Sequence, residues 1–161
     1  TDLVQPITQI TNYNTSALNM TSKQGDSVAA LPQGMSDRYT RTVTDADVRR
    51  FAEVSGDTNP LHLDDEFAAH SRFGKRIAHG MISAGYISTV VGTQLPGPGC
   101  LYVSQTLKFR APVYIGDEVT AKVTITALDE RRGYATFETV CSVGDTDVVR
   151  GEASMLVPKR G

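Results

Sequence analysis

An acid and an imidazole lie five residues apart in a turn-forming stretch of the sequence. Asp57 and His62 are separated by Thr58-Asn59-Pro60-Leu61, and a loop stiffened by proline can bring both side chains to one small volume. There they could hold a water molecule, one group taking its proton while the other gives one. The same residues are also compatible with a purely structural turn, in which Asp and Asn side chains cap their own backbone.

The second candidate feature is the pair His79-Gly80 at the start of an apolar stretch. If a helix begins there, its first N–H groups are free and carry partial positive charge, and glycine lets a ligand approach the backbone closely. Such a helix end could polarise a carbonyl oxygen. We interpret His79 as a residue that shapes the helix start. Ser88, two turns further on, either bonds back to the main chain or supports the site from below.

Signatures of several other kinds of site are missing from the sequence. Met81 stands where a G-x-S-x-G nucleophile elbow around Ser83 would need its first glycine. There is no G-x-x-x-x-G-K-[ST] phosphate loop. The three histidines do not have the H-E-x-x-H spacing, so we predict no metal site. Cys100 and Cys141 lie in strand-like runs and are interpreted as small core residues.

The elements that must position these residues can be read from periodicity. Alternation predicts a strand over residues 38–43, and Thr44 resembles the N-cap of a helix that runs to about residue 54. A short helix capped by Asp64 should follow the loop. Residues 80–92 are apolar on nearly all sides, which predicts a buried helix. The last third contains β-rich runs at 100–110, 118–128, 135–143 and 148–157. We therefore predict an α+β fold, with a meander of antiparallel strands around one buried helix.

Size and charge limit the remaining possibilities. A chain of 161 residues suffices for one domain, and 16 Lys and Arg against 18 Asp and Glu argue against a nucleic-acid partner. No apolar run is long enough to cross a membrane. Residues 1–36 are polar and predict a partly disordered or loosely packed extension ahead of a domain at 37–161. They lack the pattern of a secretory signal, and two cysteines suit a reducing compartment. We expect a cytoplasmic protein, or a mitochondrial or peroxisomal one in a eukaryote.

The order of these motifs resembles a known family. Residues 51–62, FAEVSGDTNPLH, are similar to the hydratase 2 motif of the MaoC-like, R-specific enoyl-CoA hydratases. The resemblance continues through IAHGM at 77–81, LPG at 95–97, QTLKFRAPV at 105–113 and IGDEV at 115–119, and it covers roughly residues 38–157. It implies a hot-dog fold, a curled antiparallel sheet wrapped around a long central helix. It also implies a homodimer that joins its sheets edge to edge.

The resemblance further implies an activity and its residues. The family hydrates trans-2-enoyl-CoA reversibly to (R)-3-hydroxyacyl-CoA and uses no cofactor, since coenzyme A is part of the substrate. Asp57 and His62 would be the catalytic pair, and Asn59 would orient their loop. Gly80 would offer its N–H to the thioester oxygen, with Ser88 in support. For the substrate we expect an acyl slot lined by Met81, Gly85 and Tyr86, and phosphate contacts chosen from Lys75, Arg76, Lys108 and Arg110.

Other functions stay open at this point. The same pair of side chains would serve a 3-hydroxyacyl-[acyl-carrier-protein] dehydratase of fatty-acid synthesis, in which only the carrier differs. A hot-dog thioesterase fits less well, because the loop at 55–62 resembles that of hydratases. From a different class, the protein could be a catalytically silent module that binds acyl thioesters. It could also be one domain of a multifunctional β-oxidation protein.

Overall fold

Alternating side chains in the C-terminal third build the sheet. In the computed structural model, which describes residues 27–158, strand β4 (Glu118–Asp129) buries Val119, Ala121 and Val123 and exposes or half-exposes the residues between them. Strand β4 is followed by β5 (Tyr134–Val143) and β6 (Thr146–Leu156), which continue as an antiparallel meander. The alternation predicted for this region is confirmed, and it gives the sheet one buried face.

Three further strands complete the sheet. Strand β1 (Ser36–Thr42) pairs with β4, and β2 (Leu101–Gln105) pairs with β6, so that the order is β1-β4-β5-β6-β2. The short strand β3 (Lys108–Phe109) also pairs with β6. Within residues 27–158 this makes a six-stranded antiparallel sheet that curls without closing.

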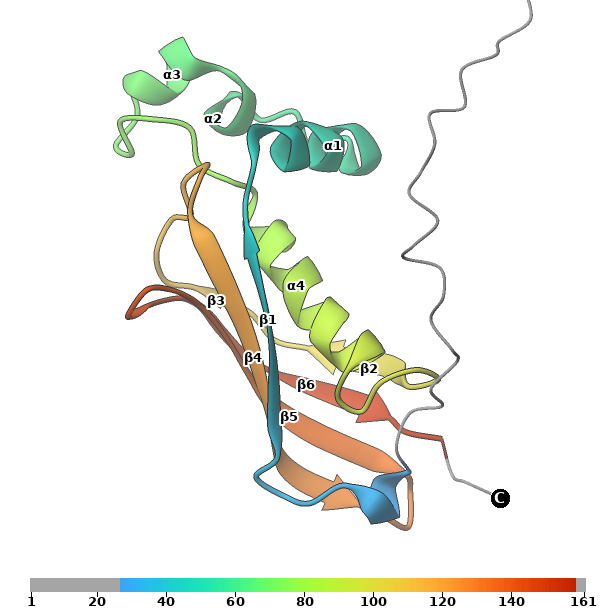
Figure 1. Cartoon of the computed structure of the whole chain (residues 1–161). Helices are drawn as coiled ribbons and strands as arrows, with labels where there is room; N and C mark the ends of the chain where they lie inside the picture. The colour runs from blue at the N-terminus through green and yellow to red at the C-terminus, as the bar shows by residue number, and fades with distance from the viewer. Residues whose placement is uncertain (1–26, 159–161) are drawn as a thin grey trace, which may run out of the picture.

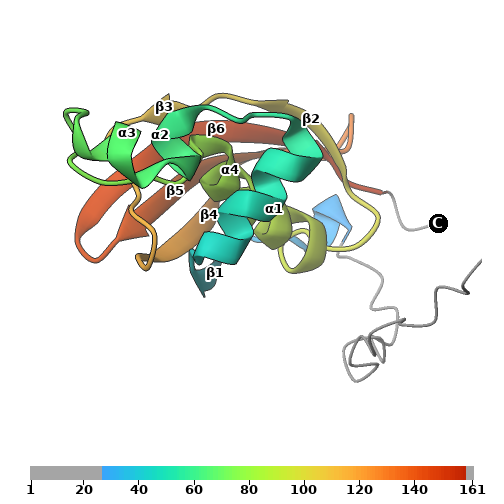
Figure 2. The ribbon, with the colours of Figure 1, turned by 90° about the horizontal axis from the view of Figure 1, so that it is seen from above.

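Helix α4 (Gly80–Thr93) lies across the inner face of the curled sheet (Figures 1 and 2). Ile87, Val90 and Val91 are fully buried against the strands. The sequence predicted a helix buried on all sides, but one stripe of α4 is exposed in this chain: Met81, Gly85, Ser88 and Gly92. Hydropathy does not distinguish a face that packs on the sheet from an apolar face that points outward, which is why the prediction was wrong on that side.

Three helices precede α4 and lie beyond the end of the sheet at which α4 begins (Figures 1 and 2). They are α1 (Asp45–Ser55), α2 (Pro60–Leu63) and α3 (Asp65–Ala69). Thr44 caps α1 as predicted, and Asp64 caps α3 by accepting a hydrogen bond from the Phe67 amide at 2.9 Å. The site loop of residues 55–62 therefore lies between α1 and α2, above the start of α4.

The polar N-terminal segment belongs partly to the packed structure. A short 3-10 helix (Val28–Ala30) buries Val28, and Leu31 joins the same core, ahead of the boundary expected at residue 36. Residues 1–26 and 159–161 lie outside the described residues. None of the helices in the described part is long and apolar enough to span a membrane. The architecture is the predicted α+β arrangement, with a curled antiparallel sheet around a long helix.

The cap of α1 provides a first test. The Thr44 hydroxyl accepts a hydrogen bond from the Asp47 amide at 3.1 Å, and the Asp47 carboxylate accepts one from the Thr44 amide at 3.0 Å. Thr44→Ala should lower the free energy of unfolding by about 1 kcal/mol, whereas Thr44→Ser keeps the hydroxyl and should stay close to the wild type. Urea unfolding at one protein concentration, followed by circular dichroism, measures this. Equal stability of all three proteins would contradict the assignment.

Candidate active site

The loop that carries Asp57 leaves α1 through a left-handed turn. Gly56 has a φ of 77°, a conformation that residues with a Cβ adopt at a cost, and its amide closes α1 on the Ala52 carbonyl. The Ser55 hydroxyl donates to the Phe51 carbonyl at 2.6 Å and accepts from the Asp57 amide at 3.2 Å. The direction in which the chain enters the loop is therefore set before Asp57.

Two short-range side-chain bonds shape the rest of the loop. The Asp57 carboxylate accepts a hydrogen bond from the Asn59 amide at 3.2 Å. The Asn59 side chain in turn caps α2, accepting from the Leu61 amide at 3.0 Å, with Pro60 at the first helical position. The structural turn considered from sequence is thus present. Through Asn59 it also ties Asp57 to the helix that carries His62.

The imidazole of His62 is held by the segment before α4. Its Nδ1 lies 2.8 Å from the Ile77 carbonyl oxygen. Because a carbonyl only accepts, Nδ1 carries the hydrogen and Nε2 of the neutral ring keeps a lone pair. The guanidinium of Arg76 reaches the His62 carbonyl at 3.3 Å and forms ion pairs with Asp45 and Asp65, each at 2.7 Å. His62 is therefore fixed at both its ring and its backbone.

Gly80 occupies the first position of α4, where an amide has no partner within the helix. A Cβ at this position would lie 2.5 Å from the Phe109 ring, so the ring covers the backbone of Gly80 closely. Gly80 and His62 both line one cavity of about 410 Å³, a size typical of small-molecule sites. The remaining lining residues are Arg72, Phe73, Ile77, Ala78, Met81, Ser83, Phe109, Arg110, Ala111, Pro112, Val113 and Val149.

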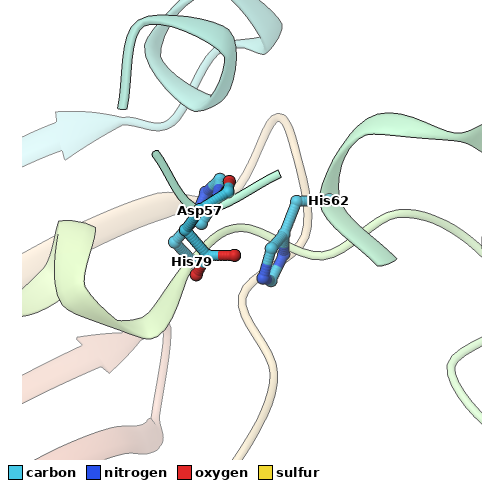
Figure 3. Close-up of side chains that lie close together, drawn as sticks. All are labelled: Asp57, His62 and His79. Atoms are coloured by element: carbon cyan, nitrogen blue, oxygen red, sulfur yellow. The ribbon is translucent and has the colours of Figure 1, made fainter. Parts of the chain in front are cut away.

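Asp57, His62 and His79 form a cluster beside this cavity (Figure 3). One oxygen of Asp57 and one nitrogen of each imidazole all lie within 4.8 Å of one another. Two groups that hold the same water through hydrogen bonds of about 2.8 Å lie roughly 4.5 to 5.5 Å apart. The limit of 4.8 Å places Asp57 and His62 close enough for one water molecule to contact both, and Nε2 is the His62 nitrogen that the bond to Ile77 leaves available.

His79 has a larger part in this cluster than the sequence indicated. It was interpreted as shaping the helix start, but its side chain makes no cap hydrogen bond to α4. It is 2% exposed, its Nε2 lies 3.0 Å from the Asp57 carbonyl oxygen, and its ring centroid lies 3.9 Å from that of His62. Burial lowers the pKa of His79 below the ordinary value, and the charge of His62 acts in the same direction. The sequence feature that could have indicated this role is the position of His79 directly before Gly80.

The residue types of this cluster are those that bind zinc, so the geometry decides whether they suit an ion. The rings of His62 and His79 lie close together and are tilted, with centroids 3.9 Å apart and 32° between their planes. Ring nitrogens bind a metal in the plane of the ring, and Nδ1 of His62 is already bonded to the Ile77 carbonyl. Nε2 of His79 is also occupied by the Asp57 carbonyl. The observed arrangement suits hydrogen bonding better than metal coordination.

The residues expected to support the site or bind the acyl group lie in different places. Met81 lines the cavity, whereas Gly85, Tyr86 and Ser88 do not belong to its lining. Gly85 and Ser88 lie on the exposed stripe of α4. Tyr86 points into the core and meets Tyr39 edge-on at 5.6 Å, where burial raises its pKa. Periodicity along a helix does not show which of its faces borders a cavity.

The expected phosphate contacts also separate into two groups. Arg110 lines the cavity and is exposed, and Arg72, which sequence reasoning missed, does the same. Lys108 is exposed but lies outside the lining, and Lys75 stands over the ring of Tyr114 at 4.5 Å. Arg76 is engaged in the two ion pairs described above. Arg72 and Arg110 are thus the two arginines that line the cavity.

Comparison with known proteins connects this site to characterised relatives. Residues 26–147 match the family described as MaoC like domain. The chain is 50% identical to the (R)-specific enoyl-CoA hydratase of Rhodospirillum rubrum over 131 residues, which are 81% of this chain and 91% of that protein. It is 51% identical to the 3-hydroxybutyryl-CoA dehydratase of Methylorubrum extorquens over 130 residues, 81% of this chain and 83% of the relative.

A solved structure supports the same relationship. The (R)-hydratase from A. caviae involved in PHA biosynthesis superimposes with a TM-score of 0.78 at 44% identity, covering 80% of this chain and 98% of that one. The match confirms the hot-dog fold that the sequence resemblance implied. The chain belongs to the MaoC-like family and is a hydro-lyase of the hydratase and dehydratase type.

Proposed function

We propose that this protein adds water to trans-2-enoyl-CoA to give (R)-3-hydroxyacyl-CoA, and catalyses the reverse dehydration. The observation that carries the proposal is the closeness of Asp57 and His62, whose polar atoms lie within 4.8 Å of each other, beside a cavity that His62 shares with Gly80. Hydration of a conjugated thioester needs those two things together, a held water and a donor to the carbonyl oxygen. The similarity to R-specific hydratases supports the choice of product enantiomer.

The first half of the proposed reaction concerns the water. The thioester carbonyl draws charge from the alkene, which makes C3 electrophilic. A water molecule held by Asp57 and His62 attacks C3, one of the two side chains takes its proton, and a proton from the pair reaches C2. The hydroxyl group of the water therefore ends on C3 and a hydrogen ends on C2, without a net change in the oxidation state of the substrate. Holding water and alkene together removes much of the entropic barrier.

The second half concerns the oxygen of the thioester. Charge grows there as C3 is attacked, and an N–H donor aimed at that oxygen stabilises it more in the transition state than in the ground state. Gly80 lines the cavity at the positive end of a 14-residue helix, with its amide free of intrahelical partners. Its lack of a Cβ leaves room for both Phe109 and a ligand beside the backbone.

The proposal needs no cofactor, because addition of water to an alkene is neither a redox nor a group-transfer step. Coenzyme A enters as part of the substrate, and we assign its phosphates to Arg72 and Arg110, which carry positive charge at the cavity. We place the reaction in the cytoplasm, since Cys100 and Cys141 are both free thiols.

Substitution of the pair tests the proposal directly. Asp57→Asn and His62→Gln should each lower kcat on crotonyl-CoA by about 100-fold or more, because each removes a group that moves a proton. Loss of the absorbance of the conjugated enoyl thioester measures the rate. Asp145→Asn and His70→Gln make the same chemical changes at exposed positions away from the cavity lining, and they should keep the wild-type rate. A fully active Asp57→Asn or His62→Gln variant would contradict the assignment.

The same assay separates the competing functions. Chiral analysis of the product should give the (R) alcohol. Faster turnover of the thioester on acyl carrier protein than on coenzyme A would move the assignment to a fatty-acid dehydratase. Release of free thiol, detected with a thiol reagent, would indicate a thioesterase. Tight binding of crotonyl-CoA with no turnover would indicate a silent binding module.

We also propose that two copies of this chain form a homodimer through the edge strand β2. Strand β2 ends the sheet on one side, and its first four residues are exposed, with Leu101 at 62% and Val103 at 52%. An exposed apolar edge pairs readily with another strand. The exposed stripe of α4, in which Met81 is 52% exposed, is a second face that a partner would cover. Antiparallel pairing of two β2 strands is self-complementary, as a two-fold dimer requires.

A charge placed on this edge should separate the subunits. Val103→Lys should convert the dimer to a monomer in sedimentation equilibrium, because the ammonium group would be buried without a partner. Thr42→Lys is the matched control, since threonine has the shape of valine and Thr42 is exposed on β1, the opposite edge of the sheet. It should remain dimeric. A monomeric wild type, or a dimeric Val103→Lys variant, would refute this interface.

A further inference from the structure

His79 touches every part of the proposed catalytic machinery without facing the cavity itself. Its Nε2 donates to the Asp57 carbonyl, its ring lies on the ring of His62, and its peptide joins Gly80. Its ring is absent from the cavity lining, and it is 2% exposed. We propose that His79 is a positioning residue, whose imidazole sets the spacing between Asp57, His62 and the Gly80 amide. This rests on the hydration proposed above.

The two contacts of the ring call for different chemical properties. The ring of His79 also packs near Phe51, with centroids 4.8 Å apart, so one flat side chain fills the space beside both Phe51 and His62. A phenylalanine would fill that space but could not donate to Asp57. A glutamine could donate but would leave the His62 ring without support on one face. Histidine combines both, and a role limited to starting α4 explains neither contact.

The structure also keeps this imidazole neutral. Among the described residues, Nδ1 of His79 has no hydrogen-bond partner and is buried. A proton on that atom would create a buried cation with nothing to accept its hydrogen bond, beside the ring of His62. Burial accordingly lowers the pKa of His79. The neighbouring groups that titrate are His62, which also lowers this pKa, and Asp57, which raises it. A neutral ring lets His62 gain and lose its proton without a second positive charge against it.

Two substitutions separate the two contacts. His79→Phe keeps a flat ring and loses the donor to Asp57, whereas His79→Gln keeps a donor and loses the ring. Each should lower kcat on crotonyl-CoA by roughly 10-fold to 100-fold with KM within about two-fold of the wild type, since small displacements of reacting groups have effects of this size. His70→Gln, at an exposed histidine, is the control and should retain both constants.

A second readout does not depend on turnover. Nitrogen-15 NMR of the His62 ring should show the single Nδ1–H tautomer in the wild type and in His79→Phe, where a flat neighbour holds the ring against Ile77. In His79→Gln the ring is free to turn, and both tautomers should appear. A single unchanged tautomer in His79→Gln would overturn the positioning role of the ring.

The outcomes distinguish this inference from the function on which it rests. If the wild type hydrates crotonyl-CoA and both His79 variants keep its kcat, the positioning role is refuted and the function stands. If both variants lose thermal stability but their folded fraction keeps the wild-type kcat, His79 is only structural and the inference is again refuted. If the wild type hydrates no enoyl thioester, the proposed function fails, and the tautomer of His62 still tests the inference.

Discussion

The geometry of the site depends on residues 77–79, which hold two separate parts of the fold against each other. The Ala78 amide donates to the Val113 carbonyl at 2.7 Å, and the Ile77 amide donates to Leu61 at 3.3 Å. The Ile77 carbonyl accepts the His62 ring. These bonds join the connection before β4 to the α1–α2 region, and α4 begins immediately afterward. A helix can present its first amide at a fixed point only if its start is fixed, and this segment supplies that constraint.

The ion pairs of Arg76 stabilise the same junction from outside. The guanidinium joins Asp45 at the start of α1 to Asp65 at the start of α3, and it also reaches the backbone of His62. The pair of hydrogen bonds to Arg49 and Arg76 lowers the pKa of Asp45, with the Arg49 bond the larger cause, so this carboxylate stays ionised at neutral pH. Arg76, which the sequence analysis included among the possible phosphate contacts, thus connects three segments of the protein. The arginines placed at the cavity are Arg72 and Arg110.

Much of the fold could be predicted because it follows local rules. Thr44 and Asp47 satisfy each other within one turn, and the meander from β4 to β6 follows two-residue alternation. The site was harder, because its contacts join distant residues. The bond from His79 to Asp57 spans 22 positions, and nothing in the spacing indicates that the His79 ring meets the Asp57 backbone. The exposed side of α4 was missed for a related reason. Small residues such as Gly85 and Ser88 occur both inside buried helices and on exposed helix faces, so their type does not show which face points outward.

The pairing of β1 with β4 has a consequence for how the protein reaches this structure. Thr40 and Thr120 are bonded across these strands although they stand 80 positions apart. Asp57, His62, His79 and Gly80 all lie within the loop that this pair closes, whereas β4, β5 and β6 are neighbours joined by tight turns. The entropic cost of closing so long a loop must be met before its contacts are gained. We therefore expect the C-terminal meander to assemble early from local contacts and the site to be completed late, when β1 docks against the sheet.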